Sequence, residues 1–473
     1  MSMPPDRFAG DTIAAIATPP GRGGIGVVRI SGPESLALLN RLFVPASASF
    51  AGFVPWKLHH GRLRDCAGRI LDDALAVFMP GPDTFTGEDV AELHCHGGPA
   101  VLAGVLDEVL CSARLAERGE FSRRAFLNGR MDLSQAEAVA ELIAAPTKEG
   151  ARLAAGKIEG LLGRRVSELR ELLENLRARL CLAVDFPDDE VEPLPRDVFV
   201  RDAKALEQAV SALLAGVERT RCWREGVSVA LAGAVNAGKS SLMNAFLGRP
   251  RAIVAARPGT TRDFLEEPLN LDGLSVRLVD TAGLRGGEEP DDPVESEGIR
   301  MGLSRVREAD VVVLLVDGER GLTPETVSLA AGLEAKKLIL VWNKMDLAAA
   351  PDLFLHGRGE WEAVPCAGRC AICARSGQGV DELARLVRKV VLAGLGARLP
   401  EPGEIVPNAR QARELETARE ALAALRVDAR DGLPYELCAV RLEETARALD
   451  NITGADAPED VLNRIFDTFC VGK

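Results

Sequence analysis

The sequence predicts a multidomain protein of mixed α/β and α+β class, in which a domain with a mostly parallel sheet interrupts a helical domain. Three observations support this prediction. At 473 residues the chain is too long for one hydrophobic core. Between residues 225 and 393, short apolar runs alternate with helical segments, which favours a parallel sheet covered by helices. Helical periodicity lies on both sides of that region, so we expect one helical domain with an insertion.

Two regions contain strand-like runs. Residues 1–128 are punctuated by Gly and Pro and contain runs such as 26–30 and 74–78, which predicts a small N-terminal α+β domain. Residues 225–393 are predicted to form the inserted domain. Its expected buried strands are 227–231, 276–279, 311–316 and 338–341.

The other two regions, 129–224 and 394–473, are predicted to form the discontinuous helical domain. In the first, leucines recur at three- and four-residue steps from Leu161 to Leu180. An acidic, proline-containing break at 185–190 precedes another expected helix at 201–221. In the second region the expected helical segments are 409–425, 434–452 and 458–469.

The composition is that of an ordinary globular protein, with 47% hydrophobic and 27% charged residues. No apolar run approaches the roughly 18 residues that cross a membrane. Residues 1–10 lack the apolar core of a secretion signal, and the ten cysteines are scattered as reduced thiols would be. We therefore expect a cytoplasmic protein. The net charge is −13, and no part of the sequence stands out as a basic domain. Any RNA contact is therefore expected to be local or shared with a partner protein.

The most specific motif is a phosphate-binding loop. Gly233-Ala-Val-Asn-Ala-Gly238-Lys239-Ser240 matches G-x4-G-K-[ST] and follows a run, 225–231, that alternates like a strand. The two glycines let backbone N–H groups wrap phosphates at the start of a helix. Lys239 can reach the β- and γ-phosphates, and Ser240 can ligate Mg²⁺.

Further motifs follow in the order of a guanine-nucleotide switch. The segment Gly259–Asp263 offers a threonine to Mg²⁺, and Asp280-Thr-Ala-Gly283 offers a carboxylate to Mg²⁺ and a backbone N–H to the γ-phosphate. In Asn343-Lys-Met-Asp346, the carboxylate of Asp346 can accept hydrogen bonds from the N1–H and 2-amino groups of guanine, a pair of donors that adenine does not offer. One phosphate loop alone would indicate an NTPase, whereas this ordered set predicts a GTPase.

One expected residue is absent. Many small GTPases place a glutamine after D-x-x-G to orient the attacking water, and this chain has Leu284 there. Hydrolysis therefore needs another group to position water and another positive charge. We predict that Asn236 helps bind a monovalent cation beside the phosphates, and that a carboxylate between 288 and 297 orients the water.

With these residues, the chain resembles the MnmE/TrmE family of tRNA-modification GTPases over almost its whole length. The resemblance also rests on long, unusual strings outside the nucleotide site. These are Thr18-Pro-Pro-Gly-Arg-Gly-Gly24, Arg29-Ile-Ser-Gly32, Phe85-Thr-Gly-Glu-Asp89, His96-Gly-Gly-Pro99, Arg124-Ala-Phe-Leu-Asn-Gly-Arg-Met-Asp132, Gln135-Ala-Glu-Ala138 and Phe469-Cys-Val-Gly-Lys473.

The resemblance implies an N-terminal folate-binding and dimerisation domain, a helical domain split by a Ras-like P-loop G domain, and a homodimer. It implies a heterotetramer with an FAD-dependent partner enzyme that modifies carbon 5 of the wobble uridine of tRNA. The one-carbon donor would be 5-formyl-tetrahydrofolate or a related folate. Potassium would promote pairing of the G domains and hydrolysis of GTP.

The resemblance also implies roles for individual residues of the nucleotide site. Asn236 would be the side-chain potassium ligand, and Glu295 would position the water. The other expected metal contacts are backbone carbonyls of the loop from Ala255 through Arg257 to Thr260 for potassium, and Ser240 and Thr261 for Mg²⁺. The expected catalytic residues are Glu295, Asn236 and Lys239. The expected nucleotide and ion contacts are Asn236, Ala237, Gly238, Lys239, Ser240, Ser241, Ala255, Thr260, Thr261, Asp280, Thr281, Ala282, Gly283, Asn343, Lys344, Asp346, Cys373, Ala374 and Arg375.

For the folate site, the resemblance implies contacts at Arg29, Glu92 and Arg130, with Lys473 near the pocket. Cys470 would be the near-terminal cysteine of the family. From the residues alone, the tail 470–473 is better described as frayed, whereas the resemblance implies that it folds back to the folate pocket.

The chain departs from the family pattern at several positions. Val235 stands where proline is common. Ala255 replaces a usual threonine of the potassium loop, which is tolerable only if this position contributes its backbone carbonyl. Arg257 brings a charge to the potassium loop. Arg130 replaces a frequent lysine and changes the geometry of the charge. Cys373 stands where serine usually lies behind the guanine, a contact made mostly by the backbone.

Some features have a plainer alternative. Cys366, Cys370 and Cys373 are close enough to suggest a metal site, but no fourth Cys or His has suitable spacing, so none is expected. His94 and His96 are expected to be structural. The arginines of the helix at 164–179 could touch tRNA, but interleaved glutamates favour a solvated face.

Two other functions remain open at this stage. A ribosome-assembly GTPase would use the same G domain as a timer, although such proteins usually carry an RNA-binding domain or a second G domain. A stand-alone folate-dependent methyltransferase with a regulatory G domain would need no flavoprotein partner.

Overall fold

The computed structural model describes residues 10–185, 195–248, 267–271, 273–280 and 306–473, except 307, 395, 397, 402 and 456. The chain forms two compact units. The first comprises residues 1–140, 157–206 and 417–473, and the second comprises 141–156 and 207–416. Within the described residues, no helix combines the length and the apolar character that crossing a membrane demands.

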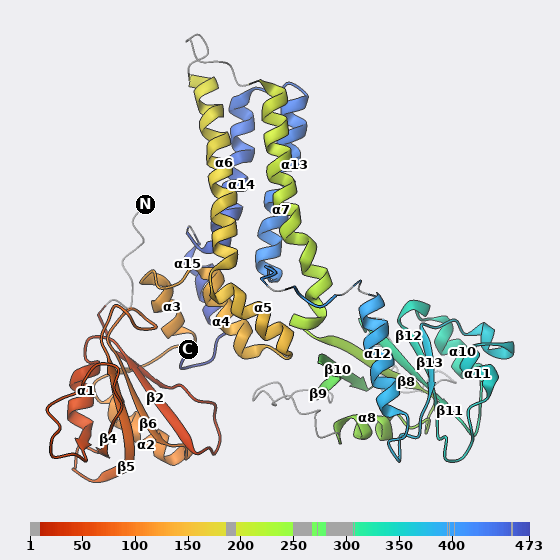
Figure 1. Ribbon diagram of the computed structural model, residues 1–473, viewed down its shortest axis with the longest axis horizontal. Helices are drawn as coiled ribbons and strands as arrows, with labels where there is room; N and C mark the ends of the chain where they lie inside the picture. Colours follow the sequence, from red (N-terminus) through yellow and green to blue (C-terminus); the bar gives the residue numbers. More distant parts are fainter. Residues whose placement is uncertain are drawn as a thin grey trace, which may run out of the picture. The chain divides into compact units, whose positions relative to one another are not determined.

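The first unit contains a seven-stranded sheet in the order β3-β4-β5-β6-β2-β1-β7. Helices α1 and α2 cover one face of this sheet, and their leucines and valines pack against Val28, Ile30, Ala91 and Leu93 (Figure 1). Because side chains alternate along a strand, the neighbouring residues Arg29 and Glu92 lie on the opposite face. The elements are β1 Ile13–Ile16, β2 Ile25–Ser31, α1 Ser35–Leu42, β3 Phe43–Pro45, β4 His59–Arg64, β5 Ile70–Met79, β6 Val90–His96, α2 Pro99–Leu110 and β7 Arg114–Leu115.

The same unit also contains helices from two separate regions of the sequence, one before and one after the second unit's main segment 207–416. Parts of α6, α7, α13 and α14 run side by side (Figure 1), with a buried leucine stripe along α6. Arg170 of α6 donates to Asp450 of α14 at 3.0 Å, and Arg196 of α7 donates to the carbonyl of Ala429 in α13 at 3.0 Å. The helices of this unit are α3 Glu120–Leu127, α6 Leu161–Asp185, α14 Tyr435–Thr453 and α15 Glu459–Phe466, together with most of α4 Leu133–Ala144, the first part of α7 Arg196–Arg224 and the last part of α13 Ala409–Arg430. Most of α5 Lys148–Ile158 and the remaining parts of α4, α7 and α13 belong to the second unit.

The second unit is built on a six-stranded sheet in the order β13-β12-β11-β8-β10-β9. All neighbouring strands are parallel except β9, which pairs antiparallel with β10. Apolar side chains of α8 and α12 cover one face, and those of α10 and α11 cover the other. The elements are β8 Val227–Gly233, α8 Lys239–Leu247, β9 Glu267–Leu271, β10 Leu274–Asp280, β11 Val311–Asp317, α10 Pro324–Ala331, β12 Leu338–Asn343, α11 Asp352–His356, β13 Gly368–Ala371 and α12 Val380–Gly394, with short 3₁₀ turns at Ala335–Lys337 and Gly359–Ala363.

The predicted strands and helices are confirmed, with three corrections. The run before the phosphate loop does not alternate, because β8 is a central strand with helices over both faces and is buried at every position except Ser228. Strands β9 and β13 were not expected. The end of α7 belongs to the core of the second unit, where Trp223 is buried and its indole N–H donates to the carbonyl of Arg398 at 2.9 Å. Of the acidic break at 185–190, only Asp185 lies within the described residues, as the last residue of α6.

Candidate nucleotide-binding site

The phosphate loop joins β8 to α8, as the motif predicts. Gly233 and Gly238 have φ angles of +146° and +99°, which L-residues rarely adopt. A Cβ atom on Gly233 would lie 2.7 Å from the carbonyl oxygen of Leu315. The loop therefore needs glycine here both for its conformation and for its packing. It ends at the N-terminus of α8, where the backbone N–H groups of the first helical turn favour an anion.

Asn236 also lies in the left-handed region, with φ of +65°. Asparagine tolerates this conformation better than most residues. Lys239 folds back over the loop and donates from Nζ to the carbonyl oxygens of Gly233 and Ala234, at 2.7 and 3.0 Å. The lysine ammonium is thereby held at the loop that would wrap the phosphates.

The base loop is the pair of segments 343–346 and 373–375, which are predicted to surround the guanine base, and Asn343 connects these segments to each other and to the phosphate loop. Its Nδ2 donates to the carbonyl of Ala237 at 2.7 Å, and its Oδ1 accepts from the backbone N–H of Ala374 at 3.0 Å. The residue is 2% exposed. Sequence reasoning assigned Asn343 to the guanine base and missed this linkage, because the motif does not show which strand ends meet.

The base loop is held by two side-chain contacts. Lys344 Nζ donates to Asp317 Oδ2 at 2.8 Å, and this hydrogen bond raises the pKa of the lysine. Cys373 Sγ donates to Asp346 Oδ1 at 3.1 Å, and Cys373 is 2% exposed. Asp317 is a residue that the sequence motifs did not identify.

Several predicted site residues lie wholly or partly outside the described residues. Asp280 ends β10, where its backbone pairs with Leu231, but its side chain lies outside the described residues. The following residues also lie outside the described part of the chain: Ala255, Arg257, Thr260, Thr261, Thr281, Ala282, Gly283, Leu284 and Glu295. Their roles stay predictions.

A second cluster lies on the face of the N-terminal sheet opposite α1 and α2, where Arg29 and Glu92 are mostly buried. Register pairs Arg29 of β2 with Glu92 of β6, and Arg29 Nε donates to Glu92 Oε1 at 2.9 Å. The pKa of Glu92 lies below its ordinary value, because of a hydrogen bond with His94 and then the positive charge of Arg29, which together outweigh burial. Lys473 lies within electrostatic reach: burial, then the charge of Arg29, lowers its pKa, and Glu92 opposes this.

The C-terminal tail packs on this domain, so the frayed tail expected from the residues alone is wrong. Val471 forms a β-bridge with Arg118, and the backbone N–H of Gly119 donates to the carbonyl of Cys470 at 3.4 Å. Gly472 is buried with φ of +92°, and a Cβ there would lie 2.5 Å from the carbonyl of Ile16. These contacts bring Lys473 to the Arg29–Glu92 pair.

Arg130 is the remaining predicted folate residue. Its Nε donates to the carbonyl of Thr84 at 3.0 Å, and its guanidinium lies 3.8 Å from Asp83. Asn128 donates to the carbonyl of Thr86 at 2.7 Å. The segment after α3 thus holds the loop before β6, which contains the Phe85-Thr-Gly-Glu-Asp89 string.

Comparison with known proteins decides the family. Residues 133–470 match the MnmE helical domain, and residues 12–130 match the N-terminus of the GTP-binding protein TrmE. The tRNA modification GTPase MnmE of Nitratidesulfovibrio vulgaris (strain DP4) is 55% identical over 98% of this chain and 99% of its own length. That of Lawsonia intracellularis is 50% identical over 98% and 100%. The chain belongs to the MnmE/TrmE family.

Membership in the MnmE/TrmE family confirms the predicted class of enzyme, a GTP hydrolase among the tRNA-modification GTPases. Among solved structures, the G domain of the T. maritima FeoB iron transporter is 26% identical and covers 35% of this chain and 98% of its own length. Its TM-score of 0.26 is too low to support a shared arrangement, so the assignment rests on the sequence relatives.

Metal binding by cysteines finds no support in this MnmE-family chain. Within the described residues, no group of three or more His, Cys, Asp or Glu side chains is arranged to hold a metal ion. Burial raises the pKa of the Cys370 thiol to about 12, so the thiol is neutral in the core of the second unit.

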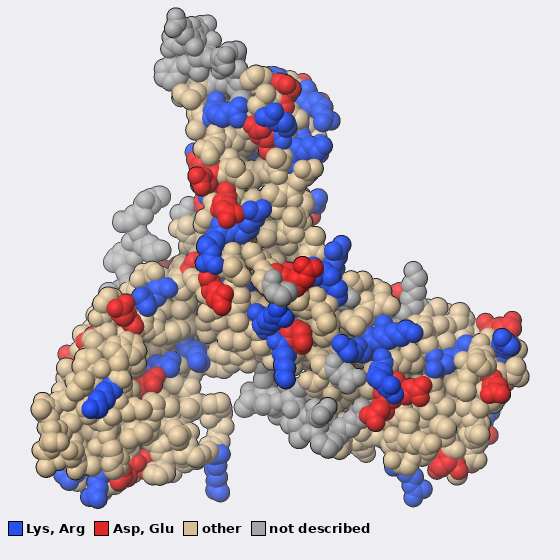
Figure 2. Space-filling model, in the orientation of Figure 1, with Lys and Arg blue, Asp and Glu red and all other residues tan. Residues whose placement is uncertain are grey.

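The arginines of α6 pair with carboxylates, as a solvated face would. Arg165 contacts Glu168, and Arg177 contacts Glu174 and Glu443. Figure 2 shows basic and acidic side chains interspersed over these helices. The visible face of the bundle therefore gives no support to a bulk electrostatic grip on tRNA.

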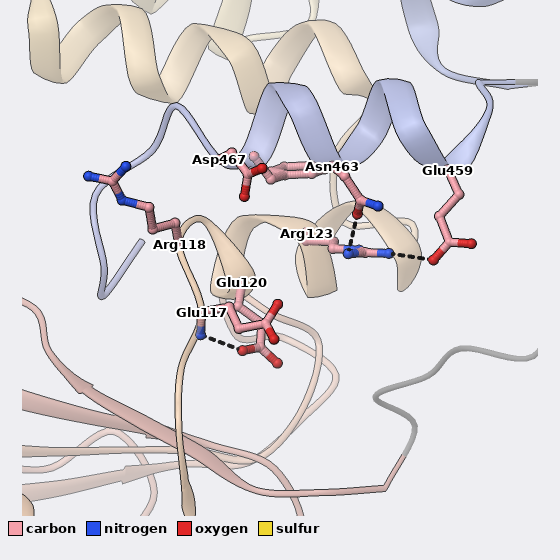
Figure 3. Close-up of a pocket in the computed structure, with 8 residues that line it drawn as sticks. Glu117, Arg118, Glu120, Arg123, Glu459, Asn463 and Asp467 are labelled. Atoms are coloured by element: carbon pink, nitrogen blue, oxygen red, sulfur yellow. Dashed lines mark hydrogen bonds and ion pairs between the residues drawn. The ribbon is translucent and has the colours of Figure 1, made fainter.

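A polar cavity of about 210 Å³ lies between α3 and α15. Arg123 spans it and donates to Asn463 at 2.8 Å and to Glu459 at 3.5 Å, whereas Arg118 points away from the other labelled side chains (Figure 3). Because Arg123 pairs with Asn463 and Glu459, and Glu120 pairs with Arg114 and Arg124, we interpret the cavity as part of the junction that supports the C-terminal tail.

Proposed function

We propose that this chain is a potassium-dependent GTPase that, as a cytoplasmic homodimer, modifies carbon 5 of the tRNA wobble uridine. It acts with an FAD-dependent partner enzyme and a one-carbon folate such as 5-formyl-tetrahydrofolate. The proposal rests on the presence of two sites in one chain. In the first, Asn343 links the phosphate loop to the base loop. In the second, the C-terminal Lys473 lies near Arg29 and Glu92. The proposed domains are the predicted ranges 1–128, 129–224, 225–393 and 394–473, with the end of α7 packed into the core of the inserted domain.

The described residues of the phosphate loop fit the phosphates of GTP, and Mg²⁺ and K⁺ are the ions we propose to bind beside them. The phosphate loop presents backbone N–H groups and Lys239 to the phosphates, and Ser240 follows at the start of α8. Ser240 and Thr261 would hold Mg²⁺, which supplies positive charge when bound. Asn236, with the carbonyls from 255 to 260, would hold K⁺ in place of an arginine finger, and Glu295 would orient the attacking water.

The N-terminal cluster fits a folate, which presents a carboxylate tail and a pterin with several hydrogen-bonding groups. Arg29, Arg130 and Lys473 supply positive charge, and Glu92, held ionised beside Arg29 and His94, supplies an acceptor. The half-buried ammonium of Lys473 becomes more favourable next to an anion.

The tRNA function is tested by mass spectrometry of wobble nucleosides from a strain that lacks the protein. We expect loss of the modified uridine, restored by the wild-type chain and not by Lys239→Ala. Normal wobble uridines with stalled ribosomal subunits would refute the proposal and favour an assembly GTPase. Full modification in a strain lacking the flavoprotein partner would point to a stand-alone methyltransferase.

The role of potassium is tested with Asn236→Gly, which keeps the left-handed backbone and removes the side-chain oxygen. Wild-type GTP hydrolysis should be faster in potassium than in sodium, and the variant should lose this difference while still binding GDP. Equal wild-type rates in the two salts would eliminate the cation from the mechanism.

A further inference from the structure

Lys344 has an unusual backbone conformation in the middle of the base loop. Its φ is +67°, in the left-handed region where a non-glycine side chain is strained. Such strain persists only where the surroundings hold it in place. The neighbour on one side, Asn343, is fixed by its two hydrogen bonds to the phosphate and base loops. The conformation of Lys344 therefore decides how the chain continues from this fixed point to Asp346.

The carboxylate of Asp317 holds the other end of Lys344. Asp317 ends β11, and its backbone pairs with Asn343 at the end of the neighbouring strand. Its Oδ2 accepts from Lys344 Nζ at 2.8 Å, while its Oδ1 accepts from the backbone N–H of Glu319 at 3.1 Å. Each oxygen thus has a separate task, one toward the lysine and one toward the turn after β11.

Burial distinguishes this contact from a nearby one to the same ammonium. The side chain of Asp317 is 6% exposed, whereas that of Glu319, at 3.4 Å from Nζ, is 55% exposed. Exposed ion pairs contribute little because water screens them. A charge-assisted hydrogen bond to a buried carboxylate is stronger.

We propose that Asp317 is a positioning residue for guanine recognition, which holds Lys344 in its strained conformation and so sets the direction of Asp346 before nucleotide binds. The inference rests on the proposed GTPase function and adds to it a residue outside the nucleotide motifs. Without Asp317, the lysine side chain and the base loop would be ordered only on binding, and that ordering would weaken the affinity for nucleotide.

The test uses Asp317→Asn in the full-length chain, with GDP and IDP as probes in isothermal titration. The amide oxygen of the variant can still accept from the N–H of Glu319, while its NH₂ group cannot accept from Lys344. The turn is thereby kept and the contact to lysine lost. We expect GDP affinity to fall about three- to tenfold. IDP lacks the 2-amino group whose hydrogen bond Asp346 would accept, so the affinity for IDP should fall less than the affinity for GDP. The matched control, Glu319→Gln, should change GDP affinity less than twofold.

A second variant separates positioning from general stability. Lys344→Met removes the ammonium and should weaken GDP binding at least as much as Asp317→Asn. In the Lys344→Met background, Asp317→Asn should have no further effect. An additional loss in that background, an unchanged GDP affinity in Asp317→Asn, or an equal loss in Glu319→Gln would each overturn the assignment. Failure of the wild-type chain to bind GDP would instead refute the proposed function.

Discussion

Replacing Gly238 by alanine tests how the phosphate loop and the base loop depend on each other. The new Cβ would lie 2.1 Å from Asn343 Nδ2, the atom that donates to the carbonyl of Ala237. Asn343 is 2% exposed and bonded at both ends of its amide, so it cannot move aside without losing a contact. The left-handed conformation alone costs about 1–2 kcal/mol for a non-glycine residue. Loss of the buried hydrogen bond costs about 1–3 kcal/mol more.

The phosphate loop is a surface segment, so it can relax in the free protein and must be restored when nucleotide binds. At least about 2 kcal/mol should therefore be lost from binding, or roughly 30-fold in affinity. The assay is GDP titration, paired with thermal unfolding of the free protein. Gly432→Ala is the matched control, because Gly432 has φ of +87° and a Cβ atom there would meet no other atom within 4 Å. It should lose some stability and no affinity. A Gly238→Ala variant that binds GDP within threefold of wild type would refute the reasoning.

Three further outcomes are expected. Removing the thiol with Cys373→Ala should reduce the preference for GDP over IDP about fivefold, because Asp346 loses its donor, while Cys373→Ser should retain the preference in the same titrations. Glu120→Gln should destabilise the first unit by about 1–3 kcal/mol, as measured by denaturant unfolding, because it removes the buried carboxylate that pairs with Arg114 and Arg124 while Arg124 keeps Asp11 and Glu88. The pKa of Glu120 is lowered from 4.5 in the folded chain, since hydrogen bonds from arginines and a backbone N–H outweigh burial. Its stabilisation is thus present above pH 4.5 and lost as pH falls through the folded pKa, so Glu120→Gln should flatten the acid limb of the stability curve. Gly472→Ala should weaken folate binding, measured by titration, and leave GTP hydrolysis unchanged, because it displaces only the tail.

The sheet of the second unit could be predicted because its central strands are buried on both faces. Such strands need apolar residues at successive positions, and this produces continuous apolar runs such as 311–316. The phosphate loop could be predicted because its glycines are needed at fixed spacing. Strand β13 was missed, since Gly368–Ala371 is short and contains Arg369. The assignment of the end of α7 to the second unit was missed as well, because a helix pattern shows which face is apolar but not which core it meets.

Contacts between distant residues were accessible only through the family resemblance or the structure. Arg29 and Glu92 are opposite each other because β2 and β6 pair in one register, and a shift by one residue would separate them. Nothing in the local sequence fixes that register. The packing of Gly472 against β1 could not be predicted from the local sequence either. A terminal Gly-Lys is typical of a frayed end, and only the structure shows that Gly472 faces the carbonyl of Ile16.

The positions of the strained backbone residues indicate that the phosphate loop and the base loop are structurally coupled. Among the residues that the structure describes, the non-glycine positions with positive φ are Trp56, Asn236 and Lys344. Two of the three thus lie in the phosphate loop and the base loop, and Asn343 hydrogen-bonds across from one loop to the other. Strain of this kind is retained where neighbouring contacts enforce it. Since Asn343 contacts both loops, a change that relaxes either one should be felt by the other, and phosphate binding and base selectivity should weaken together rather than separately.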